Sequence, residues 1–125
     1  MTKVFIVNEP LRRDDATGEY VRFLPMESAA DFGRVIKLTP DGNPGSNARE
    51  WMNKIRAGLE KDWEDGDFIV LVGDQAMLAY AASVVGEYIA ERDANGLSMP
   101  TLRFLKWERR KGAYVPLVLR EAESV

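Results

Sequence analysis

Apolar runs of strand length recur along the chain and are separated by turn residues. They predict strands at residues 3–7, 34–39, 67–72, 101–107 and 113–119. The run at 67–72, DFIVLV, is apolar almost throughout, which is typical of a strand buried on both faces at the centre of a sheet. The last run contains Pro116, which cannot donate a hydrogen bond to a neighbouring strand, so we expect that strand at a sheet edge.

The pattern changes to a helical period after Asn47. An apolar side chain recurs at every fourth position on one face of this segment, at Trp51, Ile55, Leu59 and Trp63. We expect Asn47 to cap the helix, with Glu50 at the capping-box position, and Gly66 to mark its end. A second helix is expected from about Gln75 to Arg92, apolar nearly all round in its first turns.

Strands and helices alternate, which predicts an α/β protein with a mostly parallel sheet. We expect a single domain over residues 1–125, with two main helices and a C-terminal antiparallel hairpin completing a mixed sheet. Residues 1–25 read as a strand followed by a loop with the character of an irregular hairpin, and residues 28–33 as one helical turn with Ser28 as N-cap. The tail at 120–125 is expected to be frayed.

Cysteine and histidine are both absent from the 125 residues. Their absence excludes disulfides, thiolate nucleophiles, Ser-His-Asp triads and the common zinc sites. Carboxylates, lysine, tyrosine or a magnesium site remain available for catalysis, so an enzyme is possible but less expected than a binding protein, and no cofactor is implied.

No apolar run approaches the roughly eighteen residues of a membrane span. The start of the chain, MTKVFIVNEP, lacks the apolar region of a signal peptide. We therefore expect a cytoplasmic protein that does not engage a membrane.

The chain carries 17 basic and 20 acidic residues, a formal net charge of −3 that disfavours a globally cationic nucleic-acid binder. Residues 101–112 are nevertheless locally basic. Within them, a predicted hairpin tip gathers the candidate nucleic-acid ligands Lys106, Trp107, Arg109, Arg110 and Lys111, with Tyr114 nearby. Cations and aromatic rings on a β-ribbon can neutralise phosphates and stack on bases, whereas a charged tip can also simply protect an exposed sheet edge.

A small-ligand site is a separate possibility at the loop 41–47 and at Asp74. Backbone amides at the start of the first helix, near Ser46 and Asn47, could bind a phosphate. Asp74 follows the expected central strand, where open α/β sheets tend to bind ligands. The alternative interpretation is that Asn47 and Asp74 serve only as helix caps.

The segment 60–67 is acidic, with carboxylates at Glu60, Asp62, Glu64, Asp65 and Asp67. It could hold Mg²⁺, present a negative surface to a partner, or form an ordinary solvated helix end.

Three stretches, VFIVNEP, FIVLVGDQAML and LKWERRKGAYVPL, together resemble small proteins of unknown function encoded by tailed bacteriophages and prophages. The resemblance implies a phage or bacterial context and no catalytic residues. We rank three hypotheses: binding to a phage or host protein through the acidic segment or the sheet edge, nucleic-acid binding through the basic hairpin, and a nucleotide- or Mg²⁺-dependent activity at Asp74 and the 41–47 loop.

Overall fold

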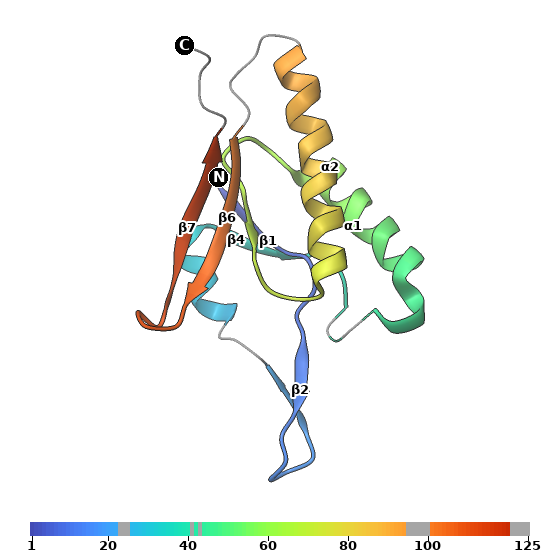
Figure 1. Ribbon diagram of the computed structural model, residues 1–125, viewed down its shortest axis with the longest axis vertical. Coiled ribbons are helices and arrows are strands. Elements are labelled where there is room, and N and C mark those ends of the chain that lie inside the picture. Colours follow the sequence, from blue (N-terminus) through green and yellow to red (C-terminus); the bar gives the residue numbers. More distant parts are fainter. Residues whose placement is uncertain (23–25, 41, 43, 95–100, 121–125) are drawn as a thin grey trace.

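The computed structural model describes residues 1–22, 26–40, 42, 44–94 and 101–120. In this part of the chain a five-stranded sheet has the order β4-β1-β5-β6-β7 (Figure 1). Its strands are β1 (Lys3–Ile6), β4 (Arg34–Lys37), β5 (Phe68–Val70), β6 (Thr101–Glu108) and β7 (Ala113–Arg120). The first four run parallel and β7 pairs antiparallel with β6. The predicted α/β class, the central position of β5 and the edge position of the strand with Pro116 are confirmed.

Alternating side chains of the strands divide the core into two layers. The helices α1 (Ala48–Asp62) and α2 (Gln75–Ala94) cover one face of the sheet, and the 3-10 helix η1 (Met26–Phe32) covers part of the other. Phe5, Ile69 and Phe104 point to the helical side, together with Ile55, Leu59 and Val85. Val4, Ile6, Val70 and Leu105 point to the η1 side, where they pack with Ala29 and Tyr114. No helix among the described residues is long and apolar enough to cross a membrane.

The helix α1 begins directly after Asn47, as predicted, but its C-terminal end differs from the prediction. It ends at Asp62 rather than near Gly66, because Asp67 Oδ2 accepts a hydrogen bond from the Glu64 amide at 2.8 Å and holds a turn there. Trp63 has extended φ/ψ angles (−68°, 132°) and still reaches the core, with its ring 5.4 Å from that of Phe5.

Asn47 precedes α1, but its side chain makes no capping hydrogen bond. The chain enters α1 through a short 3-10 turn, η2 (Gly45–Asn47), in which the Asn47 amide donates to the Pro44 carbonyl. This turn leaves Asn47 at φ −95°, ψ 20°, outside the extended region from which a side-chain oxygen reaches the first helical amides.

Ser28 is not an N-cap, because η1 begins at Met26 and Ser28 lies inside it. A 3-10 helix aligns residues three positions apart, so Ala29 and Phe32 share the face that packs on the sheet. Gly33, which follows η1, must be a glycine because the backbone of Thr2 lies very close to it. A Cβ at this position would collide with the carbonyl of Thr2, which accepts a hydrogen bond from the Arg34 amide.

The two sheet strands β4 and β5 are shorter than predicted. Past the end of β4, the Thr39 hydroxyl replaces a ladder bond and donates to the Val7 carbonyl at 2.8 Å. Past β5, the Val72 amide bonds back to the Val70 carbonyl, which turns the chain towards α2.

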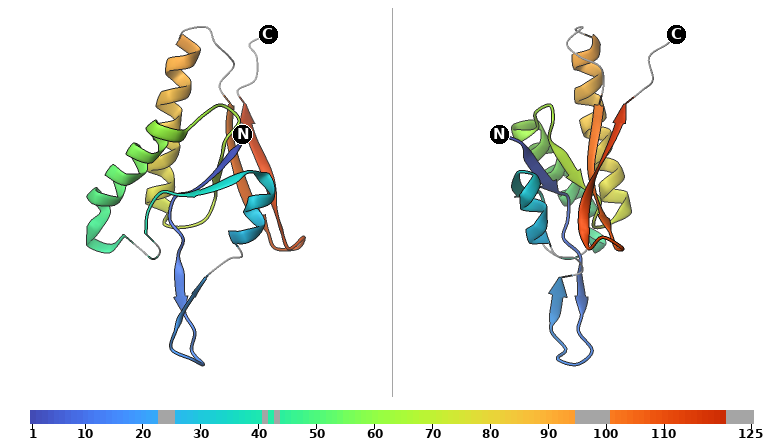
Figure 2. Two further views of the ribbon diagram at one scale, coloured as in Figure 1. Left: turned by 180° about the vertical axis from the view of Figure 1, so that it is seen from behind. Right: turned by 90° about the vertical axis from the view of Figure 1, so that its left-hand side faces the viewer.

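The expected irregular hairpin is present as a two-stranded antiparallel ribbon, β2 (Leu11–Arg13) and β3 (Tyr20–Arg22). It projects from the end of the molecule towards which the parallel strands run (Figures 1 and 2). The frayed tail expected at 120–125 lies, beyond Arg120, outside the described residues.

Candidate functional site

The loops that follow β1 and β5 meet at the position where open α/β sheets commonly bind ligands. Asn8 is fully buried there. Its Oδ1 accepts a hydrogen bond from the Asp74 amide at 2.7 Å, and its Nδ2 donates to the Gly42 carbonyl at 3.0 Å. A Cβ at Gly73, where φ is +115°, would collide with Asn8. The carboxamide therefore fills this position and ties three loops together.

The predicted small-ligand residues are arranged around this junction. Asp74 Oδ1 accepts a hydrogen bond from the Met77 amide at 3.0 Å, which is the N-cap interaction of α2. Ser46 and Asn47 lie exposed in η2. Asn8 joins the loop of Gly42 to Asp74, so both candidate segments contact a residue that the sequence did not single out. Asp41 and Asn43 of the same loop lie outside the described residues.

An ion pair between the buried Glu9 and the exposed Lys37 lies beside the junction on the η1 side of the sheet. Glu9 is 1% exposed, and its Oε2 lies 2.6 Å from Lys37 Nζ. Burial raises the pKa of the Tyr114 hydroxyl to about 12, and the negative charges of Glu9 and Glu27 add to this effect. Tyr114 is therefore protonated at neutral pH and is not available there as a base.

The basic hairpin tip separates its cations from its aromatic rings. Lys106 and Trp107 are neighbours in β6, so their side chains lie on opposite faces of the sheet. Trp107 packs against Tyr114, with ring centroids 5.0 Å apart, and belongs to the η1-side core. Arg109, Arg110 and Lys111 are exposed in the turn and form no ion pair among the described residues. The turn thus presents three cations without an adjacent stacking platform.

The acidic segment is largely partnered within the fold. Lys3 Nζ lies 2.8 Å from Glu64 Oε1 and 3.2 Å from Asp67 Oδ2, and the Lys3 amide donates to Asp67 Oδ1 at 2.9 Å. The hydrogen bond to Glu64 raises the pKa of Lys3 against the opposing effect of burial, and lowers the pKa of Glu64. Among the described residues, no group of three or more acidic side chains could hold a metal ion.

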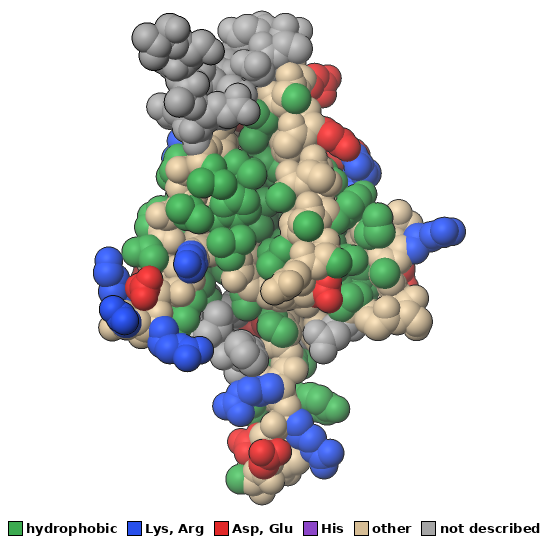
Figure 3. All heavy atoms as spheres, viewed as in Figure 1, with side chains coloured by type: hydrophobic (Ala, Val, Ile, Leu, Met, Phe, Trp, Pro, Cys, Tyr) green, Lys and Arg blue, Asp and Glu red, His purple; other side chains and the backbone are tan. Residues whose placement is uncertain are grey.

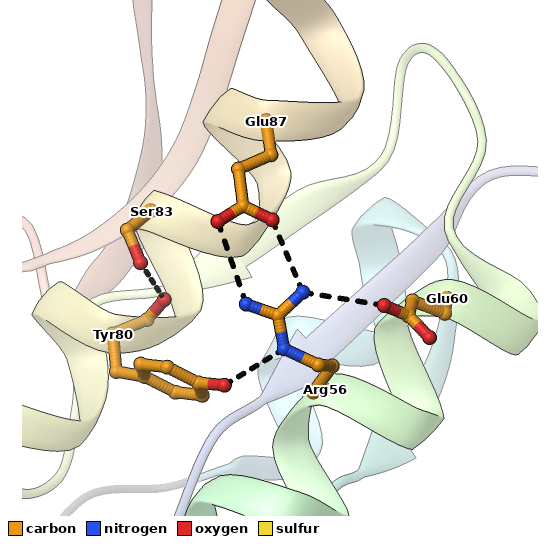
Figure 4. A network of polar contacts seen from close by, with 5 residues as sticks. All are labelled: Arg56, Glu60, Tyr80, Ser83 and Glu87. Atoms are coloured by element: carbon orange, nitrogen blue, oxygen red, sulfur yellow. Dashed lines mark hydrogen bonds and ion pairs between the residues drawn. The ribbon is translucent and has the colours of Figure 1, made fainter. Parts of the chain in front are cut away.

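A cleft of about 120 Å³ lies between α1 and α2, with Leu59, Trp63 and Val84 in its lining. Arg56 crosses its rim (Figure 4). The guanidinium donates to the Tyr80 hydroxyl at 2.9 Å, to Glu60 at 3.2 Å and to Glu87 at 3.0 Å. The hydrogen bonds to Glu87 and Tyr80 raise the pKa of Arg56. The hydrogen bond from Arg56 in turn lowers the pKa of Glu87. These contacts join the two helices.

Exposed apolar side chains of the described residues lie on β6 and β7, on the face of the sheet that carries α1 and α2. Leu102 is opposite Leu119 and Phe104 is opposite Leu117, so these four side chains share the face that α1 and α2 cover elsewhere. Leu117 is 40% exposed and Leu119 is 49% exposed. Figure 3 shows apolar side chains running from β6 and β7 to the near side of α2. We call this region, which comprises Leu102, Phe104, Leu117 and Leu119, the β7 apolar face.

Sequence reasoning missed Asn8, Glu9 and the β7 apolar face. The polar pair Asn8-Glu9 comes directly after a buried strand, and this position was the available signal. Alternation in β7 predicted the strand, but whether a helix covers it depends on packing that sequence spacing alone does not define.

The comparisons with known proteins place the chain in a phage context. A family model described as phage Pam3 gp32-like protein matches residues 2–121. Neither the curated proteins nor the solved structures gave a match. The match covers nearly the whole chain and agrees with the resemblance of the three sequence stretches to small phage proteins. The chain therefore belongs to the phage Pam3 gp32-like family and is a small phage-type accessory protein.

Proposed function

We propose that this accessory protein acts without catalysis, by binding another protein through the β7 apolar face. One observation carries the proposal: Leu117 and Leu119 are 40% and 49% exposed and continue an apolar surface from β6 and α2. A contiguous exposed apolar patch on a small protein commonly marks an interaction site. Of the two contacts expected from the sequence, we favour the sheet edge over the acidic segment, because Glu64 and Asp67 of that segment are engaged by Lys3 within the fold.

The charges that border this face define the partner's chemistry. Lys106 lies on the same face, opposite Val115, and is exposed. The cationic turn Arg109–Lys111 follows directly at the end of the ribbon. A partner that presents apolar side chains next to acidic ones would match both the apolar face and its basic border.

The contact is expected to use side chains more than backbone pairing. Pro116 lies in the middle of β7 and has no amide hydrogen, so a further strand could not pair continuously along this edge. The apolar face of the ribbon remains available to a partner helix or loop.

The closed junction at Asn8 supports a binding role over an enzymatic one. In this fold a substrate crevice would be expected at the carboxyl ends of β1 and β5. The Asn8 side chain and the loop of Gly42 fill that position.

The double variant Leu117→Ser/Leu119→Ser tests the proposal, with Val118→Ser as its matched control. Val118 is 44% exposed but points to the opposite face of the same strand. Each protein would be used to capture partners from extracts of infected cells. We expect the double variant to weaken the principal contact by roughly tenfold or more, because two leucines lose their burial. We expect Val118→Ser to retain it.

Equal capture by the wild type and the double variant would contradict the proposal. Equal loss with Val118→Ser would also contradict it, because the two faces of β7 would then not differ. Thermal unfolding of all three proteins confirms that each is folded.

A further inference from the structure

We infer that a second surface of this protein binds single-stranded nucleic acid through two separate elements that carry exposed Lys and Arg side chains. One is the β6–β7 turn with Arg109, Arg110 and Lys111. The other is the shaft of the β2–β3 hairpin with Arg12, Arg13 and Tyr20. This inference does not rest on the proposed protein contact: the two share the turn Arg109–Lys111, but the β2–β3 hairpin belongs to the nucleic-acid surface alone.

The β2–β3 hairpin presents an aromatic ring beside a guanidinium. Tyr20 is directly opposite Arg13 in the register and is 71% exposed. Arg12 and Arg13 are also exposed and form no ion pair among the described residues. On the face that Tyr20 shares with Arg13, the ring can stack on an unpaired base while the guanidinium contacts its phosphates. Arg12 projects from the opposite face of this narrow ribbon and can contact a strand that wraps around it.

The hairpin has a well-formed turn that holds these side chains in place. The Asp14 amide donates to the Glu19 carbonyl at 2.8 Å, and the Gly18 amide donates to the Asp14 carbonyl at 2.7 Å. Asp14 Oδ1 also accepts from the Ala16 amide at 2.8 Å, so this carboxylate is engaged within the turn. The remaining acids of the turn, Asp15 and Glu19, lie at or near the tip, beyond the arginines of the shaft.

The two cationic elements are far apart in sequence but project from the same end of the molecule. The parallel strands run towards this end, and both the β6–β7 turn and the β2–β3 hairpin extend there (Figures 1 and 2). Figure 3 shows Lys and Arg side chains on both projections in one view. A flexible single strand can bend from one projection to the other, whereas a rigid duplex is less suited to two unequal projections.

The inference gives a definite salt dependence. Five cations that each neutralise one phosphate of a single strand give a slope of roughly −3.5 in log K against log salt concentration. Raising the salt from about 50 to about 200 mM should therefore weaken binding roughly 100-fold. The net charge of −3 for the whole chain makes nonspecific attraction a poor explanation of such binding.

Fluorescence anisotropy with a labelled oligothymidine of about 20 nucleotides tests the inference on the full chain. We expect binding that weakens with salt as calculated. Arg12→Ala/Arg13→Ala should reduce the slope by about 1.4. The control Arg49→Ala/Lys54→Ala removes the same charge from exposed positions of α1 and should leave the slope unchanged.

The stacking role of Tyr20 has its own comparison. Tyr20→Ala should weaken oligothymidine binding about tenfold, and Tyr20→Phe should retain the wild-type affinity, because stacking needs the ring and not the hydroxyl. Neither substitution is expected to change the stability of the fold appreciably, because Tyr20 is exposed.

Four results would overturn the inference. One is no salt-dependent binding by the wild type. Another is equal loss of slope in the Arg49→Ala/Lys54→Ala control. The third is competition by a polyglutamate peptide as effective as that by oligothymidine at equal charge, which would assign the surface to acidic proteins. Duplex DNA that binds more tightly, with no effect of Tyr20→Ala, would also contradict the single-strand assignment.

Discussion

Asn8 connects the loops at the carboxyl ends of β1 and β5. Replacing it by alanine leaves the Asp74 amide and the Gly42 carbonyl without their partner in a buried region. We expect Asn8→Ala to lower the free energy of unfolding by about 2–4 kcal/mol. Asp74→Ala removes one helix cap and should cost about 1 kcal/mol.

Urea denaturation measures both costs, with Ser46→Ala as a control at an exposed position. The control should change the free energy of unfolding by less than about 0.5 kcal/mol. A cost for Asn8→Ala no larger than that of the control would show that the junction does not depend on this side chain.

The contact between Lys3 and Glu64 predicts a pH dependence of stability. The hydrogen bond from Lys3 holds the pKa of Glu64 below its ordinary value of 4.5 in the folded protein. A lowered folded-state pKa stabilises the protein above pH 4.5, and this contribution is lost as the pH falls through the folded-state pKa. The raised pKa of Lys3 extends the stabilised range upwards, until the pH rises past its ordinary value of 10.5 and through the raised value.

Unfolding of the wild type and Glu64→Gln at pH 7 and pH 3 tests this prediction. The wild type should be the more stable protein at pH 7, and the difference should shrink as the pH falls below 4.5 and through the lowered pKa of Glu64. A difference that stays the same at both pH values would show that the ion pair is not its source.

At the scale of elements, the β2–β3 hairpin is expected to be an appendage to the folded body. An isolated two-stranded hairpin is marginal in water and contributes little to the stability of the body from which it projects. Replacing residues 11–22 by a short Gly-Ser linker should change the free energy of unfolding by about 1 kcal/mol or less. Thermal and urea unfolding measure this change.

The same deletion should abolish the tyrosine-dependent part of oligothymidine binding. A deletion variant that fails to fold would contradict the description of this hairpin as an appendage. A folded variant with unchanged oligothymidine affinity would instead count against the nucleic-acid surface.

The elements that sequence predicted well are those with strong periodicity. The apolar run at β5 and the four-residue spacing of apolar side chains in α1 predict which side chains are buried, because core packing requires apolar residues at those positions. The start of α1 after Asn47 was predicted correctly, but its C-terminal end and the capping hydrogen bond of Asn47 were not. Trp63 continues the apolar spacing although it lies outside the helix, and Asn47 has a capping side chain that the preceding 3-10 turn leaves unused. Spacing alone does not distinguish these cases.

At the scale of the whole molecule, both proposed surfaces are formed by residues that are distant in the sequence and come together only in the fold. Leu102 lies beside Leu119 only through the β6–β7 register, and whether α2 covers them depends on how far the helices extend across the sheet. Arg12 and Arg109 reach the same end of the molecule through the topology of the parallel strands. The cationic turn was predicted from the sequence because its residues are contiguous. Trp107 was wrongly grouped with these cations, because the alternation of side chains along β6 directs its ring to the other face, where it packs against Tyr114.

The two surfaces adjoin each other at the β6–β7 ribbon. The apolar face occupies the ribbon itself, and the cationic turn lies at its end. The protein contact is the central claim of this account.

Site-specific photo-crosslinking tests that claim most directly. A benzophenone amino acid would be placed at Leu119 in one protein and at the exposed α1 position Arg49 in another, and both would be irradiated in extracts of infected cells. We predict that the Leu119 probe forms a crosslink to one protein, at a segment that joins apolar to acidic residues, and that the Arg49 probe does not. Crosslinking at Leu119 no stronger than at Arg49, or only to a second copy of this chain, would contradict the account.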